Sequence, residues 1–595
     1  MSSSKLEFTL RNARAMSSFR IASSCLADGG GRLALKRIHQ VAQQRRQLSS
    51  PSTVPTECDI VIVGGGPAGL ALAGALAAIK DVRETTKIAL VEAGDLSTIR
   101  AWTQPEGTWS NRVSSITNSS KAFFEEIGAW AHVEGSRTTP LEDMQVWDGV
   151  SDARIQFSAP DIGSSNATPD QSHQLAYMTE NLNIQRALLR LLDQHSSVQV
   201  LDKVKVGSII NDAPDRGGWP VVKLTNGQEL RTRLLIGADG SNSPVKKFAG
   251  IESYGWAYDT HAVVATMSHR PAYPGTPKTA YQRFLPTGPI AFLPLSDTAS
   301  SLVWSTKPAL AAALKSAPPD VLRRMINAAF RLPDISLKIL NDILTSSSTI
   351  SSDEIADTIR WRENAHGIAP MSELSSAELI DGAASVGGYG SEADLPPLVT
   401  SIQPGSVAGF PLRMSHADIY IGEGAGARTA LVGDAAHTVH PLAGQGLNMG
   451  LADVEALAGC ISEAIRVGAD IGSKTALGPY PRARYLQNHN LISATDKLHK
   501  LYSFTWPPLV WARSVGLEVV NELDTVKAAL MMNAGSKTRM TSRNGGSPFD
   551  GGPNPLWGAA ASAVEFASGI VDSTKTVVRT AGDVGTMTLK GMYRR

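Results

Sequence analysis

The sequence is poor in cysteine and carries no excess of either charge. Its cysteines, Cys25, Cys58 and Cys460, are too few and too scattered for a disulfide framework or a structural zinc site. A reducing compartment is the simpler interpretation. The 56 basic residues balance 55 acidic ones, so the chain has no overall field for binding nucleic acid. We therefore expect no nucleic-acid partner, and any electrostatic partner must be met by local patches.

Long hydrophobic runs are also scarce. The charge-free stretch from Ile60 to Ile79 reaches the length of a transmembrane helix, for which about 20 apolar residues are needed. Its interior holds Gly64 to Gly66 and then Pro67, which break a continuous helix. We interpret the stretch as a buried parallel strand over residues 59–63 and an Ala/Leu-rich helix over residues 68–79, with a turn between them.

Acidic residues are nearly absent from residues 1–50, where Glu7 and Asp28 stand against many arginines and lysines among Ser and Ala. This composition is typical of a mitochondrial presequence. A secretory signal would need an apolar run of roughly 7–15 residues, and none separates these arginines. We expect removal of the segment near Ser49. The alternative is a disordered basic tail without a targeting role.

The turn after the first strand has the spacing of a dinucleotide-binding loop. Its first glycine permits a tight turn, its second allows a pyrophosphate to approach the backbone, and its third lets the helix pack against the strand. A second strand over residues 87–91 ends in Glu92, where a carboxylate should accept ribose hydroxyls. The loop residues expected at the cofactor are Gly64, Gly66, Pro67, Ala68 and Gly69.

Two further strands end in acidic motifs. Residues 234–238 form an apolar run that leads into Asp239 and Gly240. Residues 429–432 form another, which leads into Gly433 and Asp434. Open α/β sheets bind ligands at the carboxyl ends of such strands. A glycine-rich turn and a helix with leucines at helical spacing follow the second motif.

With these three ordered motifs, residues 57–535 resemble the aromatic-ring flavoprotein monooxygenases, the family of para-hydroxybenzoate hydroxylase. The resemblance implies an FAD cofactor whose pyrophosphate lies at the first glycines. It also implies that Asp239 and Gly240 bear on cofactor and nicotinamide handling, and that Gly433 and Asp434 hold the ribityl side. The further residues that the resemblance places beside FAD are Arg112, Gln185, Pro441, Gly444, Gln445, Gly446, Leu447 and Asn448.

Within that family the sequence is most similar to the ubiquinone-biosynthesis monooxygenases. The similarity is carried by residues 281–290, 410–412, 433–448 and 498–502, and the presequence favours the same branch. It implies hydroxylation of 4-hydroxy-3-polyprenylbenzoate at ring position 5, with O2 and a flavin hydroperoxide. It further implies electrons from a ferredoxin and its reductase, with NADPH as the alternative donor, and other ubiquinone-biosynthesis proteins as partners in a complex.

A polyprenyl substrate requires access to a membrane, so we expect peripheral contact with the matrix face of the inner membrane. Residues 498–511 combine aromatic and basic side chains, which suits an interfacial surface. The alternative is a core segment that caps the substrate domain.

The catalytic base is not evident from the sequence. His437 and His440 flank the flavin loop and histidine titrates near neutrality, but both can equally orient the loop through backbone hydrogen bonds. Arg283 could hold a substrate carboxylate through a bidentate pair, or it could be an ordinary arginine at a sheet edge.

The predicted fold is α/β, with a Rossmann-like FAD-binding domain intertwined with a β-sheet substrate domain, followed by a C-terminal helical region. Short apolar segments between residues 262 and 305 predict an antiparallel sheet as the floor of the substrate site. The expected parts are an FAD-binding domain over 57–150, 180–250 and 415–465, a substrate domain over 151–179 and 251–414 with a Ser/Ala-rich insertion at 330–395, C-terminal helices over 466–540, and a linker with an amphipathic extension over 541–595.

Two other functions remain open from the sequence. One is an NADPH-dependent hydroxylase of a soluble phenol, which would need neither a presequence nor a long apolar tunnel. The other is a non-enzymatic prenyl-binding chaperone on the same fold. A chaperone would not need a complete flavin loop, so the intact motifs at 433–434 and 444–448 count against it.

Overall fold

The computed structural model describes residues 55–158, 174–213, 218–271, 277–346, 351–368 and 395–522. The predicted presequence, the linker and the C-terminal extension lie outside the described residues, so these three assignments stay predictions.

The first sheet carries the glycine-rich turn. Its strands follow the order β8-β2-β1-β11-β10-β9, and β18 pairs with β11. Strands β1, β2 and β8 run parallel, as do β11 and β18, while β9, β10 and β11 run antiparallel. The strands are β1 (Thr56–Val63), β2 (Ile88–Val91), β8 (Val198–Leu201), β9 (Val206–Asn211), β10 (Pro220–Leu224), β11 (Glu229–Gly237) and β18 (Thr429–Leu431). The strands and the turn expected from the sequence are therefore confirmed.

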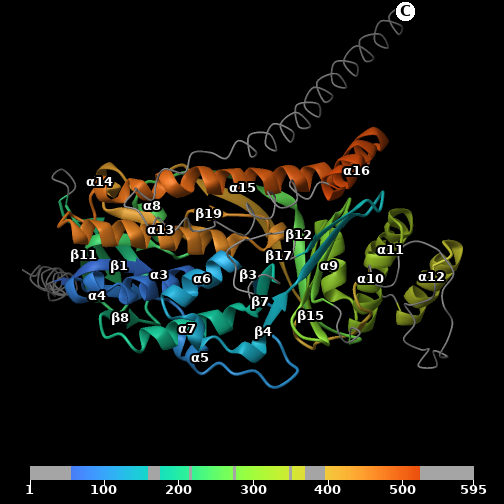
Figure 1. Ribbon diagram of the computed structural model, residues 1–595, viewed down its shortest axis with the longest axis horizontal. Helices are drawn as coiled ribbons and strands as arrows, with labels where there is room; N and C mark the ends of the chain where they lie inside the picture. The colour runs from blue at the N-terminus through green and yellow to red at the C-terminus, as the bar shows by residue number, and fades with distance from the viewer. Residues whose placement is uncertain are drawn as a thin grey trace, which may run out of the picture. The chain divides into compact units, whose positions relative to one another are not determined.

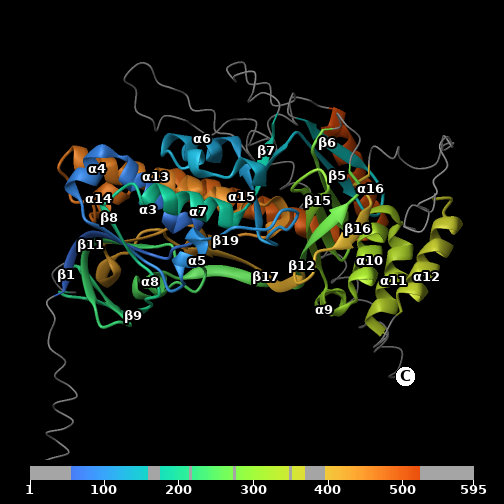
Figure 2. The ribbon, with the colours of Figure 1, turned by 90° about the horizontal axis from the view of Figure 1, so that it is seen from below.

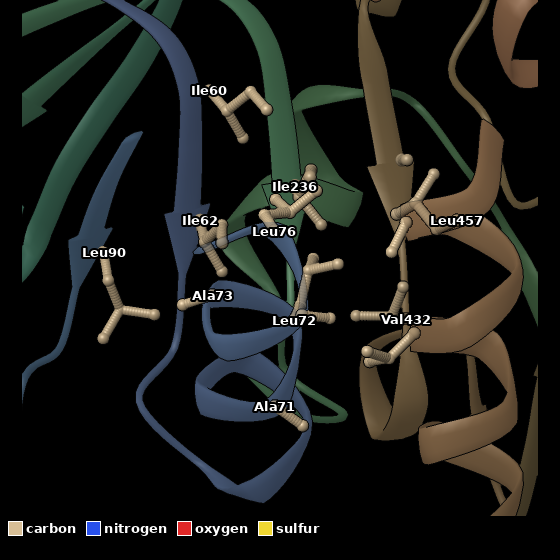
Figure 3. Packing of buried hydrophobic residues seen from close by; sticks show 14 of the residues in the cluster. Ile60, Ile62, Ala71, Leu72, Ala73, Leu76, Leu90, Ile236, Val432 and Leu457 are labelled. Atoms are coloured by element: carbon tan, nitrogen blue, oxygen red, sulfur yellow. The ribbon is translucent and has the colours of Figure 1, made fainter. Parts of the chain in front are cut away.

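Helix α3 (Pro67–Ala78) follows the turn and packs against α7 (Asn181–Leu192) and α13 (Gly446–Arg466). It is apolar all round because it is buried on every side, as expected for a helix enclosed by a sheet and other helices. Figure 3 shows Leu72 and Leu76 of α3 between the sheet residues Ile62 and Ile236 and Leu457 of α13. This core holds the cofactor loops on a rigid base.

The second sheet confirms the antiparallel sheet expected between residues 262 and 305. Its order is β19-β17-β12-β15-β14-β13-β5-β6, and β16 pairs with β12. Strands β12 to β15 pair antiparallel, and β13 pairs parallel with β5. The strands are β5 (Asp143–Asp148), β6 (Arg154–Ser158), β12 (Ser253–His269), β13 (Thr279–Leu285), β14 (Gly288–Pro294), β15 (Ala299–Thr306), β16 (Val399–Ile402), β17 (Ala408–Ala417) and β19 (His437–Thr438).

The two predicted domains interleave more finely than the expected boundaries. Strand β5 falls in the range 57–150 assigned to the FAD-binding domain, yet it joins the second sheet through β13. Strand β7 (Ala176–Glu180) falls almost entirely in the expected substrate range 151–179, yet it pairs with β3 (Val113–Thr117) and β4 (Thr138–Leu141) in a separate sheet. Local sequence could not show these pairings because each joins strands far apart in the chain.

Helices pack on one another beside the second sheet. Helices α10, α11 and α12 contact one another (Figures 1 and 2), and α10 contacts β16. The described part of the 330–395 insertion thus contributes α11, α12 and their apolar core. These helices are α9 (Pro308–Ser316), α10 (Pro319–Arg331), α11 (Asp334–Ser346) and α12 (Ser352–Ala365).

The C-terminal region is helical as far as the described residues extend. Helix α15 (Pro479–Ser503) packs against α13, and α16 (Pro507–Glu522) packs against β6. Figure 1 shows α13 and α15 running side by side. The remaining short helices are α4 (Lys80–Thr85), α5 (Leu96–Arg100), α6 (Asn118–Glu126), α8 (Pro244–Phe248) and α14 (Lys474–Leu477).

Candidate cofactor-binding site

The glycine-rich turn has three different local geometries. Gly64 has a φ of +111°, and a Cβ there would overlap the carbonyl oxygen of Ala238. A Cβ at Gly69 would overlap the carbonyl oxygen of Gly64. A Cβ at Gly66 would meet no atom within 4 Å. The fold therefore requires the first and third glycines, whereas the second keeps a space open beside the loop.

The open space lies at the start of α3. Gly66 is the N-cap residue, no side chain caps the helix, and Pro67 occupies its first turn, followed by Ala68. The unpaired N–H groups and the positive end of the helix dipole make such a terminus an anion-binding site. Gln185 of α7 reaches the same loop, where its Nε2 donates to the carbonyl oxygen of Gly65 at 3.3 Å.

Glu92 lies at the end of β2, as the spacing predicted. Its carboxylate accepts from the N–H of Gly65 at 2.5 Å and from the N–H of Gly94 at 2.6 Å. The acid is thus next to the glycine loop and held by it. Its contact with a ribose stays a prediction.

Two carboxylates extend from neighbouring parallel strands. Asp239 follows β11 and Asp434 follows β18, and these strands pair in register between Gly237 and Leu431. Burial raises the pKa of Asp239 to about 6, and its Oδ1 is buried with no hydrogen-bond partner among the residues that the structure describes. Asp434 is exposed to solvent. The surrounding protein atoms nevertheless desolvate its carboxylate in part, and this raises the pKa of Asp434. A buried carboxylate oxygen with unmet hydrogen-bonding capacity, such as Oδ1 of Asp239, and the accessible carboxylate of Asp434 both fit the hydroxyl donors of a ribityl chain.

The turn before α13 is shaped for close approach. Gly444 has a φ of +59° and is exposed, and no side chain caps the helix that begins at Gly446. Pro441 opens the preceding short helical turn, while Gln445 and Leu447 are half-buried. The free N–H groups of α13 therefore form a second positive terminus, suited to negative charge on a bound group.

Asn448 and Arg112 are connected through β3. The side chain of Asn448 donates to the carbonyl oxygen of Ser115 at 2.7 Å and accepts from the N–H of Thr117 at 3.1 Å. Asn448 thus ties α13 to β3, whose preceding residue Arg112 is exposed. The side-chain amide of Asn448 is already hydrogen-bonded to the backbone of β3. The predicted contact between Asn448 and the flavin would therefore have to be made by the backbone atoms of Asn448.

His440 has the geometry of a loop-orienting residue. Its Nδ1 accepts from the N–H of Leu442 at 3.2 Å, and its ring lies edge-on to Tyr258 and beside His499. Burial and the nearby His499 lower the pKa of His440 to about 3. A neutral imidazole whose acceptor nitrogen is occupied is poorly placed to act as a base. The alternative offered by the sequence, orientation of the loop, is the one that the structure supports.

His437 is anchored differently from the expected backbone contact. Its Nε2 lies 2.5 Å from Oδ2 of Asp453, and both side chains are buried. Sequence analysis missed Asp453, although a signal was present: it lies four residues before Leu457 on the buried face of α13. A carboxylate on an apolar helix face needs partners.

Arg283 does not have the geometry of a substrate ligand. It is 2 % exposed, and its guanidinium donates to the carbonyl oxygens of Ala329 and Leu332 at 2.9 Å and of Gly149 at 3.3 Å. It belongs to β13, which is paired on both sides and so is not a sheet edge. The expectation of a sheet edge is therefore wrong. Nη1 joins β13 to the end of α10, and Nη2 contacts Gly149 and lies 3.5 Å from a carboxylate oxygen of Asp152, so this geometry does not favour the substrate contact, which stays a prediction.

Residues 498–511 divide between the two expected roles. Tyr502 is buried and stacks on Phe284 with ring centroids 4.1 Å apart, as a capping segment would. Trp506 and Trp511 are 54 % and 70 % exposed, as an interfacial surface would require. Within the described ranges no helix is long and apolar enough to cross a membrane.

Comparisons with known proteins point to FAD as the cofactor. A family model described as an FAD binding domain matches residues 57–341 and 414–480. The chain is 36% identical to the ubiquinone biosynthesis monooxygenase COQ6, mitochondrial, of Schizosaccharomyces pombe, over 81% of this chain and 92% of that protein. The COQ6 protein of Homo sapiens is 37% identical over 82% of this chain and 94% of its own length.

Solved structures share the fold. The p-nitrophenol 4-monooxygenase PnpA from Pseudomonas putida DLL-E4 superposes with a TM-score of 0.55 at 16% identity, covering 81% of this chain and 100% of that one. The probable FAD-dependent monooxygenase pqsL from Pseudomonas aeruginosa gives a TM-score of 0.52 at 19% identity, covering 78% and 99%. At these identities the likeness concerns the fold alone.

Proposed function

Because this chain belongs to the FAD-dependent monooxygenases of ubiquinone biosynthesis, we propose that it hydroxylates 4-hydroxy-3-polyprenylbenzoate at ring position 5, with O2 as oxygen source. The observation that carries the proposal is the pair of strand-end carboxylates, Asp239 and Asp434, beside an uncapped glycine-rich helix start. FAD, when bound, supplies the oxygen activation that side chains cannot.

The chain's own residues would bind and orient the cofactor. The N–H groups at the start of α3, opened by Gly64, Gly66, Pro67, Ala68 and Gly69, would hold the pyrophosphate. Glu92 would accept from the ribose, and Asp434 with Gly433 would accept from the ribityl chain. Arg112, Gln185, Gly240 and the turn from Pro441 to Asn448 would line the remaining contacts.

The second sheet would position the ring. It reaches the cofactor turn directly, because β19 pairs with β17 at His437 and His416. A ring on this floor would be held against the 441–447 turn while the buried walls keep water away.

A direct assay tests the proposed reaction. Purified protein reconstituted with FAD should turn yellow and convert a short-chain 4-hydroxy-3-polyprenylbenzoate into the 5-hydroxy product under O2. Parallel reactions with unprenylated 4-hydroxybenzoate test the soluble-phenol alternative. Equal turnover of both substrates would favour that alternative, and prenyl binding by a protein that takes up no FAD would favour the chaperone.

We propose a ferredoxin with its reductase as the electron donor. In support, the relatives are mitochondrial COQ6 proteins, the branch for which the sequence resemblance implies a ferredoxin donor. Anaerobic reduction of the bound flavin by reduced ferredoxin, compared with NADPH, decides the point. Rapid reduction by NADPH alone would overturn the assignment.

We propose that the protein works in mitochondria, on the matrix face of the inner membrane, in contact with other ubiquinone-biosynthesis proteins. Exposed Trp506 and Trp511 lie close in sequence to Lys497 and Lys500, a combination suited to a lipid headgroup region. Replacing both tryptophans with alanine should reduce sedimentation with anionic vesicles. The matched control is W361A, since Trp361 is 66 % exposed on α12. An equal loss of vesicle binding in the control and in the double variant would contradict the assignment.

Deleting residues 541–595 should likewise weaken association with membranes or the complex.

A further inference from the structure

Asp453 is a buried carboxylate directly behind the cofactor turn. It is 0 % exposed and accepts four hydrogen bonds from two segments of the chain, residues 433–437 and 484–488. The donors are the N–H of Gly433 at 3.2 Å, Nε2 of His437 at 2.5 Å, Nε of Arg484 at 3.0 Å and Nδ2 of Asn488 at 2.9 Å. Burial alone would raise the pKa of Asp453, but His437, Arg484 and Asn488 outweigh it and lower the pKa to about 2. The carboxylate is therefore ionised.

The bond to Gly433 acts on the turn that presents Asp434. Gly433 has a φ of +58°, so the chain reverses in a left-handed conformation just before the predicted ribityl ligand. Helix α13 packs closely on this turn, since a Cβ at Gly450 would lie 3.2 Å from the Cα of Gly433. Asp453 lies one helical turn beyond Gly450 on α13, where its carboxylate can hold the Gly433 N–H.

The Arg484 guanidinium has further hydrogen-bond partners besides Asp453. It donates to Oδ1 of Asn488 at 2.6 Å and to Oε1 of Gln487 at 2.7 Å. Nδ2 of Asn488 donates hydrogen bonds to Asp453 and to the hydroxyl oxygen of Tyr420, which is 3.0 Å away. The two opposite charges thus sit in one satisfied network, with few ways to relax if either is removed.

We propose that Asp453 is a positioning residue for the FAD-binding turn, and that the Asp453–Arg484 pair balances the charge that the flavin experiences there. The inference rests on the proposed function, because it presumes FAD beside Asp434. Buried charges are screened far less than surface charges, so an unbalanced one acts on a nearby redox group. A positive charge left alone favours the reduced flavin, which gains negative charge, whereas a negative charge left alone disfavours it.

Two single substitutions of opposite sign separate this role from a structural one. D453N removes the negative charge and leaves Arg484 unpaired, so the midpoint potential of the bound flavin should become more positive. R484Q removes the positive charge, so the potential should become more negative. The double variant D453N/R484Q should return close to the wild-type potential. A purely structural role would move both single variants in the same direction or leave both unchanged, and either result overturns the proposal.

FAD affinity provides the second readout. D453N should bind FAD about tenfold more weakly, as expected when a hydrogen bond to a charged group is lost. D453E keeps the charge and changes the reach, so it should weaken FAD binding while leaving the potential near that of the wild type; a potential shifted as far as in D453N would contradict the charge argument. If D453N does not fold, the D453E variant provides the test.

The control variant lies on the same helix. Arg466 and Glu463 form an exposed ion pair on α13, with side chains 64% and 60% exposed, so R466Q should change neither FAD affinity nor potential. All variants are made in the full-length chain and measured by FAD titration and anaerobic spectroelectrochemistry. A wild-type protein that binds no FAD would refute the proposed function. A wild type that binds FAD, with variants whose potentials do not move apart, would refute only the role of the pair.

Discussion

Arg513 of α16 makes a bidentate ion pair with Asp148 at the end of β5. Its Nε lies 2.7 Å from Oδ2 and its Nη2 lies 2.9 Å from Oδ1, and both side chains are buried. Nη1 also donates to the carbonyl oxygens of Leu501 and Phe504 at 2.9 and 2.6 Å. The pair therefore joins α16 and the end of α15 to β5 of the second sheet, near exposed Trp506 and Trp511 in the sequence.

We expect R513M to destabilise the protein by about 3–5 kcal/mol, because it leaves Asp148 as an unpaired buried charge. R513M combined with D148L should recover much of the loss, since apolar replacements often match a buried pair. Chemical denaturation measures both. The control R466M, in the exposed pair with Glu463, should cost less than about 1 kcal/mol. A loss from R513M no larger than the control's would contradict the assignment.

Substitution G66A should weaken FAD binding without harming the apoprotein. Gly66 has a φ of −71° and a Cβ there meets nothing within 4 Å, so only a bound pyrophosphate would be displaced. FAD titration should show at least about a tenfold loss, equal to about 1.4 kcal/mol, with unchanged apoprotein melting. G459A, at an exposed helix position that is equally open, should leave FAD affinity unchanged. Retained affinity in G66A would place the pyrophosphate elsewhere.

Asp239 should make the apoprotein less stable as pH rises. Burial raises its folded pKa to about 6, while an unfolded aspartate titrates near about 3.9. Between these values the folded state binds more protons than the unfolded state, so stability falls with rising pH. D239N lacks this penalty, and its melting temperature relative to wild type should rise from pH 4 to pH 6 and then level off. A constant difference over that interval would argue against the raised pKa.

His440 should be dispensable for the pH dependence of catalysis. Its pKa is lowered to about 3 by burial and by His499, so it stays neutral over the working range. In H440N the asparagine oxygen can accept from the Leu442 N–H in place of Nδ1. Steady-state assays from pH 6 to 9 should give a profile of unchanged shape. Disappearance of an ionisation near neutrality in H440N would restore His440 as a base.

Arg283 should matter for stability rather than for substrate binding. R283M leaves three buried carbonyl oxygens without their donor, each costing about 1–3 kcal/mol. The midpoint of denaturation should fall markedly, while the KM of the folded enzyme for the prenylated substrate stays within about twofold, a difference below about 0.5 kcal/mol. A raised KM with normal stability would show that the guanidinium does reach the substrate carboxylate.

Much of the cofactor turn could be predicted because its constraints are local. Gly64 needs a positive φ and a Cβ at Gly69 would overlap the Gly64 carbonyl oxygen, both within one strand-turn-helix unit. Glu92, Asp239 and Asp434 each follow a recognisable strand. Local patterns of this kind survive in the sequence because each depends on residues a few positions apart. The motifs therefore identified the family and the cofactor without any tertiary contact.

The roles of the buried polar residues could not be predicted in the same way. The partners of Arg283 come from two distant segments, and the arginines paired with Asp148 and Asp453 come from the C-terminal helices. Whether a charged side chain binds a ligand or joins two elements depends on what folding brings beside it, because an unpartnered buried charge is costly. The sequence by itself thus determined the fold class, the cofactor loops and the family, which rest on short-range spacing. Only the tertiary structure decided that Arg283 and His440 serve the architecture and that Asp453 and Arg484 stand behind the cofactor turn, because long-range packing chooses each partner.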